Sequence, residues 1–164
     1  MVLSDDQIFL KSTNNDDPEL INLFQAEKGL LTMSETRLYP AGTPTEITFR
    51  IEKNNVLIGE IRLKNLRWFN RKAELSIIIS EDYQRKGVGS AATKLLMEYA
   101  FNKMNLHRLE AEAIEYNKAS ISMLEKFGFV LEGTLREAKY SDGKYWGVYR
   151  YGLLRQEYLK HHKD

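Results

Sequence analysis

The sequence predicts an α/β domain in which helices pack on a mixed β-sheet. In some segments the apolar residues alternate with a period of two, and in others they recur with helical spacing. The two kinds of segment follow one another along the chain. In addition, the run Ile77–Ile79 is typical of a strand that is buried on both faces.

The first half of the chain should contain one helix, a hairpin and a central strand. Asp17 and Pro18 favour a helix over about residues 17–27, since an acidic residue and a proline suit the first turn. Asn54-Asn55 is a turn signal between two runs of β-type residues. The expected strands are Ile47–Glu52, Val56–Leu63 and Ala73–Ser80.

The second half alternates between helices and strands. From Gly87 to about Asn105 the pattern is that of an amphipathic helix, and His107–Ile114 alternates as a strand does. Asn117 should cap another helix, and Ser141-Asp142-Gly143 should join the last two strands. The apolar stripe of the long helix comprises Val88, Ala91, Ala92, Leu95, Leu96, Tyr99 and Ala100. The apolar stripe of the next helix comprises Ile121, Leu124 and Phe127. The last two strands are expected over Phe129 to about Tyr140 and over Lys144–Leu154.

Composition limits the classes of protein that the chain can belong to. Its 164 residues, of which 43% are hydrophobic, suit a single domain over residues 1–164. The absence of cysteine excludes disulfides, a thiolate nucleophile and a cysteine-ligated zinc site, and no metal is expected. An acidic start and the lack of a long apolar run predict a cytoplasmic protein without a membrane partner.

The formal net charge of +1 gives no overall attraction for nucleic acid. Five basic residues and no acidic one lie between Ile61 and Ala73, with Trp68 and Phe69 among them. A solvated loop that joins two strands explains this stretch better than a nucleic-acid patch.

A short turn, Tyr83–Ser90, lies between the isoleucine strand and the long helix. Gly87 and Gly89 allow close backbone approach, and the first amides of the helix are free to bind an anion. Arg85 and Lys86 add positive charge there. On these residues alone, a phosphate site and a plain connection fit equally well. The spacing fits neither a nucleoside triphosphate loop nor a dinucleotide fingerprint.

Two motifs in this region resemble those of the GNAT N-acetyltransferases. Gln84, Gly87 and Gly89 match the acetyl-CoA signature Gln/Arg-x-x-Gly-x-Gly/Ala, and Asn117–Phe129 matches the helix that begins with Asn and ends in Gly-Phe. The continuation Val130–Glu137 is similar to the RimJ/RimL-like branch.

The resemblance implies a single layered domain with a mixed, mostly antiparallel sheet, splayed at its central strands, with helices on both faces. Residues 73–129 would form the acetyl-CoA-binding core, and residues 1–45 the acceptor side, where Leu30–Met33 and Tyr39-Pro40 offer little polar specificity. The expected activity is direct transfer of the acetyl group from acetyl-CoA to an amine. The expected partners are acetyl-CoA, an amine acceptor and, as one candidate, a second copy of the chain.

Acetyl-CoA would occupy a gap beside the central strand. In the family the two central strands part after a bulge, and pantetheine bonds to the main chain of one of them. The residues expected to bind it are Ile77, Ile78, Ile79, Gln84, Arg85, Lys86, Gly87, Val88, Gly89, Ser90, Asn117 and Ser120.

Ser120 is the expected proton or hydrogen-bond donor to the leaving thiolate. Many relatives use a tyrosine seven residues after the Asn, but that position is Leu124 here. Tyr116 and Tyr140 are weaker candidates, and a plain first-turn hydroxyl is the structural alternative for Ser120.

The base that deprotonates the amine is harder to assign. The glutamate position of RimL-type enzymes falls on Lys139, which argues against a peptide N-terminus as acceptor. Glu74 is the first candidate, because it precedes the buried strand at the acceptor end of the cleft. Glu112, Glu115, Glu137 and a chain of waters are the alternatives.

Gly147 stands where relatives often carry an Asp, and the aromatic residues around it either line the acceptor pocket or pack the last hairpin. The acceptor therefore stays open among a protein N-terminus, a small amine and an amino sugar. A CoA-binding sensor or scaffold without activity and a ribosome- or RNA-associated module are the competing functions.

Overall fold

The computed structural model describes residues 2–4, 8–14, 16–27, 29 and 35–162. The chain divides into two compact units, Met1–Thr43 and Pro44–Asp164, which we describe separately. In the first unit, β1 (Val2–Ser4) pairs antiparallel with β2 (Phe9–Lys11), and α1 covers Pro18–Ala26. The predicted helix is confirmed, whereas the pair of short strands was not predicted. A 3-10 turn, Glu35–Leu38, follows.

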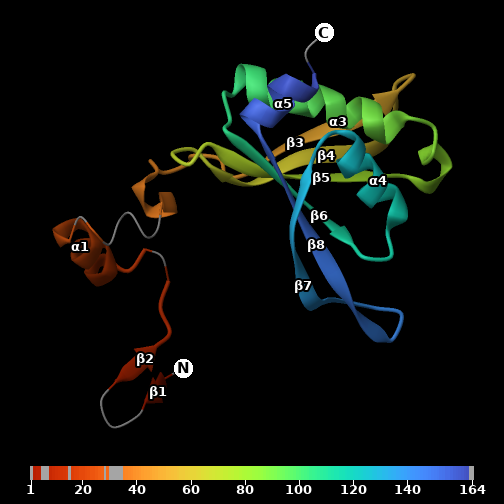
Figure 1. Ribbon diagram of the computed structural model, residues 1–164. Helices are drawn as coiled ribbons and strands as arrows, with labels where there is room; N and C mark the ends of the chain where they lie inside the picture. Colours follow the sequence, from red (N-terminus) through yellow and green to blue (C-terminus); the bar gives the residue numbers. More distant parts are fainter. Residues whose placement is uncertain (1, 5–7, 15, 28, 30–34, 163–164) are drawn as a thin grey trace. The chain divides into compact units, whose positions relative to one another are not determined.

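The second unit is built on a six-stranded mixed sheet (Figure 1). The strand order is β3-β4-β5-β6-β8-β7, and every neighbouring pair is antiparallel except β5 with β6. The mixed, mostly antiparallel sheet is therefore confirmed. The strands are β3 (Ile47–Lys53), β4 (Val56–Arg67), β5 (Lys72–Ile79), β6 (Arg108–Ile114), β7 (Val130–Ser141) and β8 (Lys144–Leu154).

The core lies between this sheet and the helices α3 (Val88–Glu98), α4 (Lys118–Lys126) and α5 (Arg155–His161) (Figure 1). Leu109, Ala111 and Ala113 of β6 are buried there, as predicted from their alternation. Sequence reasoning did not find α5. It follows β8 without a glycine or proline between them, and the Glu157 carboxylate accepts the Leu154 amide at 2.8 Å.

The long helix differs from its prediction in two ways. Its buried face includes Thr93 and Met97, while Leu95 is 68% exposed, so the apolar stripe is rotated from the predicted one. The last turn, Tyr99–Lys103, is a π-helix in which the Met104 amide donates to the Tyr99 carbonyl at 3.0 Å.

The basic stretch after Ile61 is mostly strand rather than loop. β4 continues through Arg67 and β5 begins at Lys72, so the connection is confined to residues 68–71. Arg62, Lys64 and Lys72 form ion pairs with glutamates. These pairs neutralise much of the charge on which a nucleic-acid interface would depend.

Candidate functional site

The two central strands separate halfway along their length. β5 and β6 are in parallel register from Lys72 opposite Arg108 to Leu75 opposite Ala111, and their pairing ends there. Beyond this point β5 pairs only with β4, and β6 only with β8, among the described strands. The edge of β5 over Ser76–Ile79 is thus left without a strand partner on the β6 side, as expected for the splayed sheet.

The predicted bulge does not accompany this separation. The register of β5 with β4 is continuous from Glu74 to Ile79, and the shift in that pair lies between Lys64 and Arg67. The prediction that the isoleucine strand is buried on both faces is wrong, because Ile78 is 58% exposed. Its side chain points away from the helices, on the face where the sheet carries charged residues.

The turn after β5 is fastened to the end of that strand. The Gln84 side chain donates from Nε2 to the Ile79 carbonyl at 2.9 Å. Gly87 precedes α3 with φ of +78°, a conformation that favours glycine, and a Cβ there would enter open space. Arg85 and Lys86 are exposed beside it. The residues of the acetyl-CoA signature therefore lie together at the end of the splayed strand.

The helix that follows presents its first amides at the same place. The first helical hydrogen bond is donated by the Ala91 amide to the Gly87 carbonyl at 3.0 Å, so the amides of Val88, Gly89 and Ser90 have no partner within the helix. A Cβ on Gly89 would lie 3.4 Å from Cδ1 of Ile79. A Cβ at Gly89 would thus be in ordinary contact with the protein, whereas one at Gly87 would enter open space.

Asn117 caps α4, as predicted: its Oδ1 accepts the Ser120 amide at 3.1 Å. Ser120 is half-buried and lies three residues before Met123, on the same face of the helix. Met123 contacts the beginning of α3, since its sulfur would lie 3.7 Å from a Cβ on Gly89. Ser120 therefore lies on the side of α4 that faces the turn.

Glu74 lies in the paired part of β5, two residues before the gap. It is 5% exposed, its Oε1 is 3.2 Å from Nζ of Lys64, and its Oε2 accepts Nδ2 of Asn65 at 3.1 Å. Nη1 of Arg150 is 4.0 Å from Oε2. Glu74 is thus part of an ion-pair network, and its predicted role as base stays a prediction.

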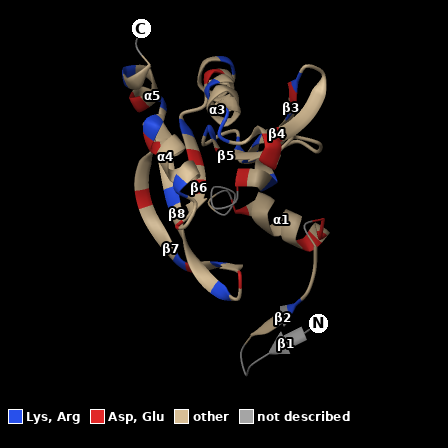
Figure 2. Ribbon diagram, turned by 90° about the vertical axis from the view of Figure 1, so that its right-hand side faces the viewer, with Lys and Arg blue, Asp and Glu red and all other residues tan. Residues whose placement is uncertain are grey.

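The network continues across the sheet, whose strands carry both acidic and basic residues (Figure 2). Arg150 also contacts Glu112, another candidate base. Burial acts to raise the pKa of Glu110, but hydrogen bonds from Lys72 and Arg108 outweigh it and lower that pKa below its ordinary value. The lowered pKa favours the ionised form of Glu110 on the face opposite the helices.

The remaining predicted carboxylates lie at the end of the sheet. Oε1 of Glu115 accepts the Gly147 amide at 2.9 Å, which joins the end of β6 to β8. Glu137 is exposed in an irregular part of β7, between Leu135 and Lys139, with φ of +49°.

The two tyrosines named as weaker proton donors lie in aromatic contacts. Tyr116 packs edge-on against Trp146 with 4.7 Å between ring centroids. Tyr140 is 62% exposed near the tip of the β7–β8 hairpin, where its ring contacts Tyr145.

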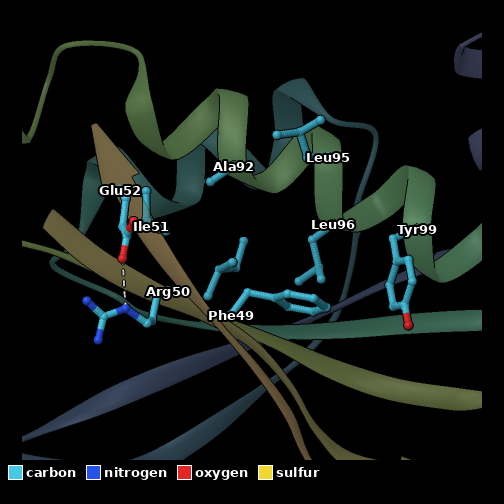
Figure 3. A pocket seen from close by; sticks show the side chains of 9 residues that line it. Phe49, Arg50, Ile51, Glu52, Ala92, Leu95, Leu96 and Tyr99 are labelled. Atoms are coloured by element: carbon cyan, nitrogen blue, oxygen red, sulfur yellow. Dashed lines mark hydrogen bonds and ion pairs between the residues drawn. The ribbon is translucent and has the colours of Figure 1, made fainter. Parts of the chain in front are cut away.

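A cavity of about 380 Å³ lies elsewhere, between β3 and α3 (Figure 3). Phe49 and Leu96 point into it, and the Arg50–Glu52 ion pair lies at its side. None of the residues predicted to bind acetyl-CoA lines it. We therefore place the candidate site at the splayed strands and not in this cavity.

The remaining expectations concern a metal site, a membrane span and the acceptor-side segment. In the described part of the chain no cluster of His, Asp and Glu could hold a metal ion, and no helix is long and apolar enough to cross a membrane. Leu30–Met33, named for the acceptor side, lie outside the described residues, whereas Tyr39-Pro40 follow the 3-10 turn.

Sequence reasoning missed Gly59, which lies opposite Ile79 in the register of β4 and β5. A Cβ on Gly59 would collide with the Ile78 carbonyl oxygen, so glycine is needed for β4 to approach the splayed strand. The only signal available was an isolated glycine in a strand pattern.

The family model for the acetyltransferase (GNAT) domain matches residues 4–147. Spermidine N(1)-acetyltransferase of Escherichia coli K12 is 34% identical over 119 residues, which are 73% of this chain and 64% of that protein. The chain thus covers slightly less than two thirds of that relative. YdaF of Bacillus subtilis, named as a candidate ribosomal N-acetyltransferase, is 36% identical over 102 residues, which are 62% of this chain and 56% of that protein.

Solved structures agree with the sequence relatives. Spermidine/spermine N-acetyltransferase SpeG from Vibrio cholerae superposes with a TM-score of 0.70 at 28% identity, covering 85% of this chain and 79% of that chain. The RimJ/RimL-like branch is not confirmed, because spermidine acetyltransferases recur among these relatives. By the family match and the splayed sheet, the chain belongs to the GNAT acetyltransferase family.

Proposed function

We propose that this protein transfers the acetyl group of acetyl-CoA to a primary amine. The observation that carries the proposal is the unpaired edge of β5 over Ser76–Ile79, which ends at the turn before α3. An extended ligand with amide groups can add to such an edge as a strand does. Pantetheine has this chemistry, and a diphosphate attached to it would reach the first amides of α3.

The charges of the turn support this orientation of CoA. The amides of Val88, Gly89 and Ser90 and the exposed Arg85 and Lys86 would hold the diphosphate at the positive end of the helix. The thioester would then lie further along the gap, beside Ile77–Ile79. A main-chain amide there would stabilise the negative charge that develops on the thioester oxygen.

The transfer would proceed in a ternary complex. The nitrogen of the neutral amine attacks the thioester carbon, the C–N bond forms, the C–S bond breaks, and the sulfur leaves as a thiolate. Ser120 would donate a hydrogen bond or proton to that sulfur. Because the chain has no cysteine, no acetyl-enzyme can form on a thiol, and both substrates must be bound together unless another nucleophile intervenes.

The amine must lose a proton before or during the attack. Glu74 is our candidate acceptor of that proton, because it is a buried carboxylate close to the start of the gap. Its contacts with Lys64 and Arg150 would have to rearrange, or a water would have to carry the proton. A Glu74→Gln variant that keeps its fold should lose activity most strongly at low pH.

For the acceptor we propose an aliphatic polyamine. Relatives from two species are named spermidine acetyltransferases, and Glu112 lies on β6 just past the end of its pairing with β5. Lys139, at the position of the RimL-type glutamate, favours such a small acceptor over a peptide.

The test is CoA release from acetyl-CoA in the presence of spermidine, an amino sugar or a peptide with a free N-terminus. We expect turnover with spermidine at the highest kcat/KM. CoA binding without turnover of any amine would favour the sensor, and tight, salt-dependent RNA binding would favour the ribosome-associated module.

A further inference from the structure

Trp146 holds the ammonium group of a lysine on its ring. Nζ of Lys144 lies 3.7 Å from the indole centroid, well within the range of cation–π attraction. On β7, Lys139 is in register with Trp146, and no ion pair of the described residues involves either lysine. The ammonium group of Lys144 therefore lies on the indole, with Lys139 opposite the ring and without an ion pair to a carboxylate among the described residues.

The indole is fixed in place by its neighbours. Its Nε1 donates to the Ser141 carbonyl at 3.1 Å, and the ring of Tyr116 meets it edge-on at an interplanar angle of 79°. Trp146 is half-buried, whereas Lys144 is exposed. The ring is thus a preformed surface, and an exposed lysine lies on it.

This aromatic pair lies just beyond the end of β6, one of the two strands that border the gap. Ile114, the last residue of β6, is opposite Val148, so Trp146 is two residues beyond that pair on β8. Tyr116 immediately precedes Asn117, the cap of the helix that carries Ser120. By strand alternation Trp146 is on the same face as Arg150, which contacts Glu112.

We propose that the Trp146–Tyr116 pair binds a second ammonium group of the acceptor and that Lys144 competes with the acceptor for this site. The ligand class is a di- or polyamine whose reacting nitrogen lies in the gap while another ammonium replaces that of Lys144 on the indole. The proposal rests on the proposed function, because it specifies the acceptor of that same site. It also makes Lys144 a determinant of amine affinity.

Two substitutions that remove the same charge separate this role from general electrostatics. Lys144→Gln frees the ring, whereas Lys139→Gln removes a cation from the position opposite Trp146 on β7 and leaves Lys144 on the indole. Isothermal titration with spermidine, in the presence of CoA, should show Kd lowered by about two- to fivefold in Lys144→Gln beyond any change in Lys139→Gln. Equal changes in the two variants, or none, would overturn competition at the ring.

The ring itself is tested with Trp146→Leu and Trp146→Phe. We expect Kd for spermidine to rise by roughly fivefold in the Leu variant and by less in the Phe variant, since phenylalanine keeps an aromatic face. Unfolding temperatures show whether the hairpin survives, and the Phe variant preserves the test if the Leu variant does not fold. Equal Kd values for parent, Phe and Leu proteins would contradict the site.

Kinetics with a monoamine distinguish this inference from the proposed function. Propylamine has no second ammonium, so its KM should be the same in parent and Trp146→Leu proteins while that for spermidine rises. If both KM values rise together, the indole does not bind the second ammonium, although acetyl transfer stands. If no amine is acetylated, the proposed function fails and the titrations still decide the ammonium site.

Discussion

Gly59→Ala tests whether the splayed edge of β5 binds CoA. An added Cβ would meet the Ile78 carbonyl oxygen well inside 3.0 Å and would lie 3.1 Å from Cα of Ile79. Restoring an ordinary contact of 3.4 Å requires Cα of Ile79 to move by 3.4 − 3.1 = 0.3 Å, and the oxygen must move further. Overpacking of this kind costs about 1–3 kcal/mol, which lowers the unfolding temperature by roughly 2–12 °C in a chain of this size.

The same shift displaces the main chain that we assign to pantetheine. Weakening one main-chain hydrogen bond costs about 0.5–1.5 kcal/mol, so Kd for CoA should rise roughly two- to twelvefold. Isothermal titration with CoA, beside thermal unfolding, measures both effects. Gly133→Ala is the matched control, because a Cβ there meets nothing within 4 Å. A Gly59→Ala protein that is destabilised but binds CoA as tightly as the parent would refute the assignment of the strand edge.

Substitutions at three further positions examine the turn, the sulfur and the charged face. Gly87→Ala should cost about 1–2 kcal/mol of stability because of its left-handed backbone, and Gly87→Asn should recover stability but not CoA affinity, since its side chain still enters the open space of the turn. Ser120→Ala should lower kcat by about ten- to a thousandfold at an unchanged Kd for CoA, and a kcat within twofold of the parent removes Ser120 from the mechanism. Because the pKa of Glu110 is lowered in the folded protein, its contribution to stability is complete above its ordinary value of 4.5 and is lost as the pH falls through the lowered pKa. Lys72→Met removes part of that lowering, so the midpoint of acid unfolding, followed by circular dichroism, should move to higher pH.

Local patterns were sufficient for most of the strands and helices. The hairpin at Asn54-Asn55 has φ of +52° and +62°, as an asparagine turn predicts, and Asn117 caps its helix through its own side chain. In such cases the partners are only a few residues apart. The turn that carries the acetyl-CoA signature lies where predicted, because its glycines and the helix that follows are contiguous in sequence.

Features that depend on distant residues could not be predicted in this way. Lys64 and Arg150, which surround Glu74, are ten and 76 residues from it in sequence. Ile78 is exposed because its side chain lies on the face of the sheet that carries charged residues and is opposite the helices. Three isoleucines in a row do not reveal which face is covered. Likewise, the collision that requires glycine at position 59 exists only once β4 and β5 are in register.

Glu115 lies against Gly147, the position at which relatives often carry an Asp. The resemblance to the family leads one to expect an Asp at 147, and the glycine there first suggests that a carboxylate has been lost. In the structure, Oε1 of Glu115 accepts the Gly147 amide at 2.9 Å, and a Cβ at 147 would lie 3.2 Å from Oε2. A side chain at 147 would therefore crowd the carboxylate that is already there. The start of β8 beside Trp146 thus has a carboxylate next to it, supplied by the residue after β6, and this carboxylate is a candidate partner for the amine that we propose as acceptor.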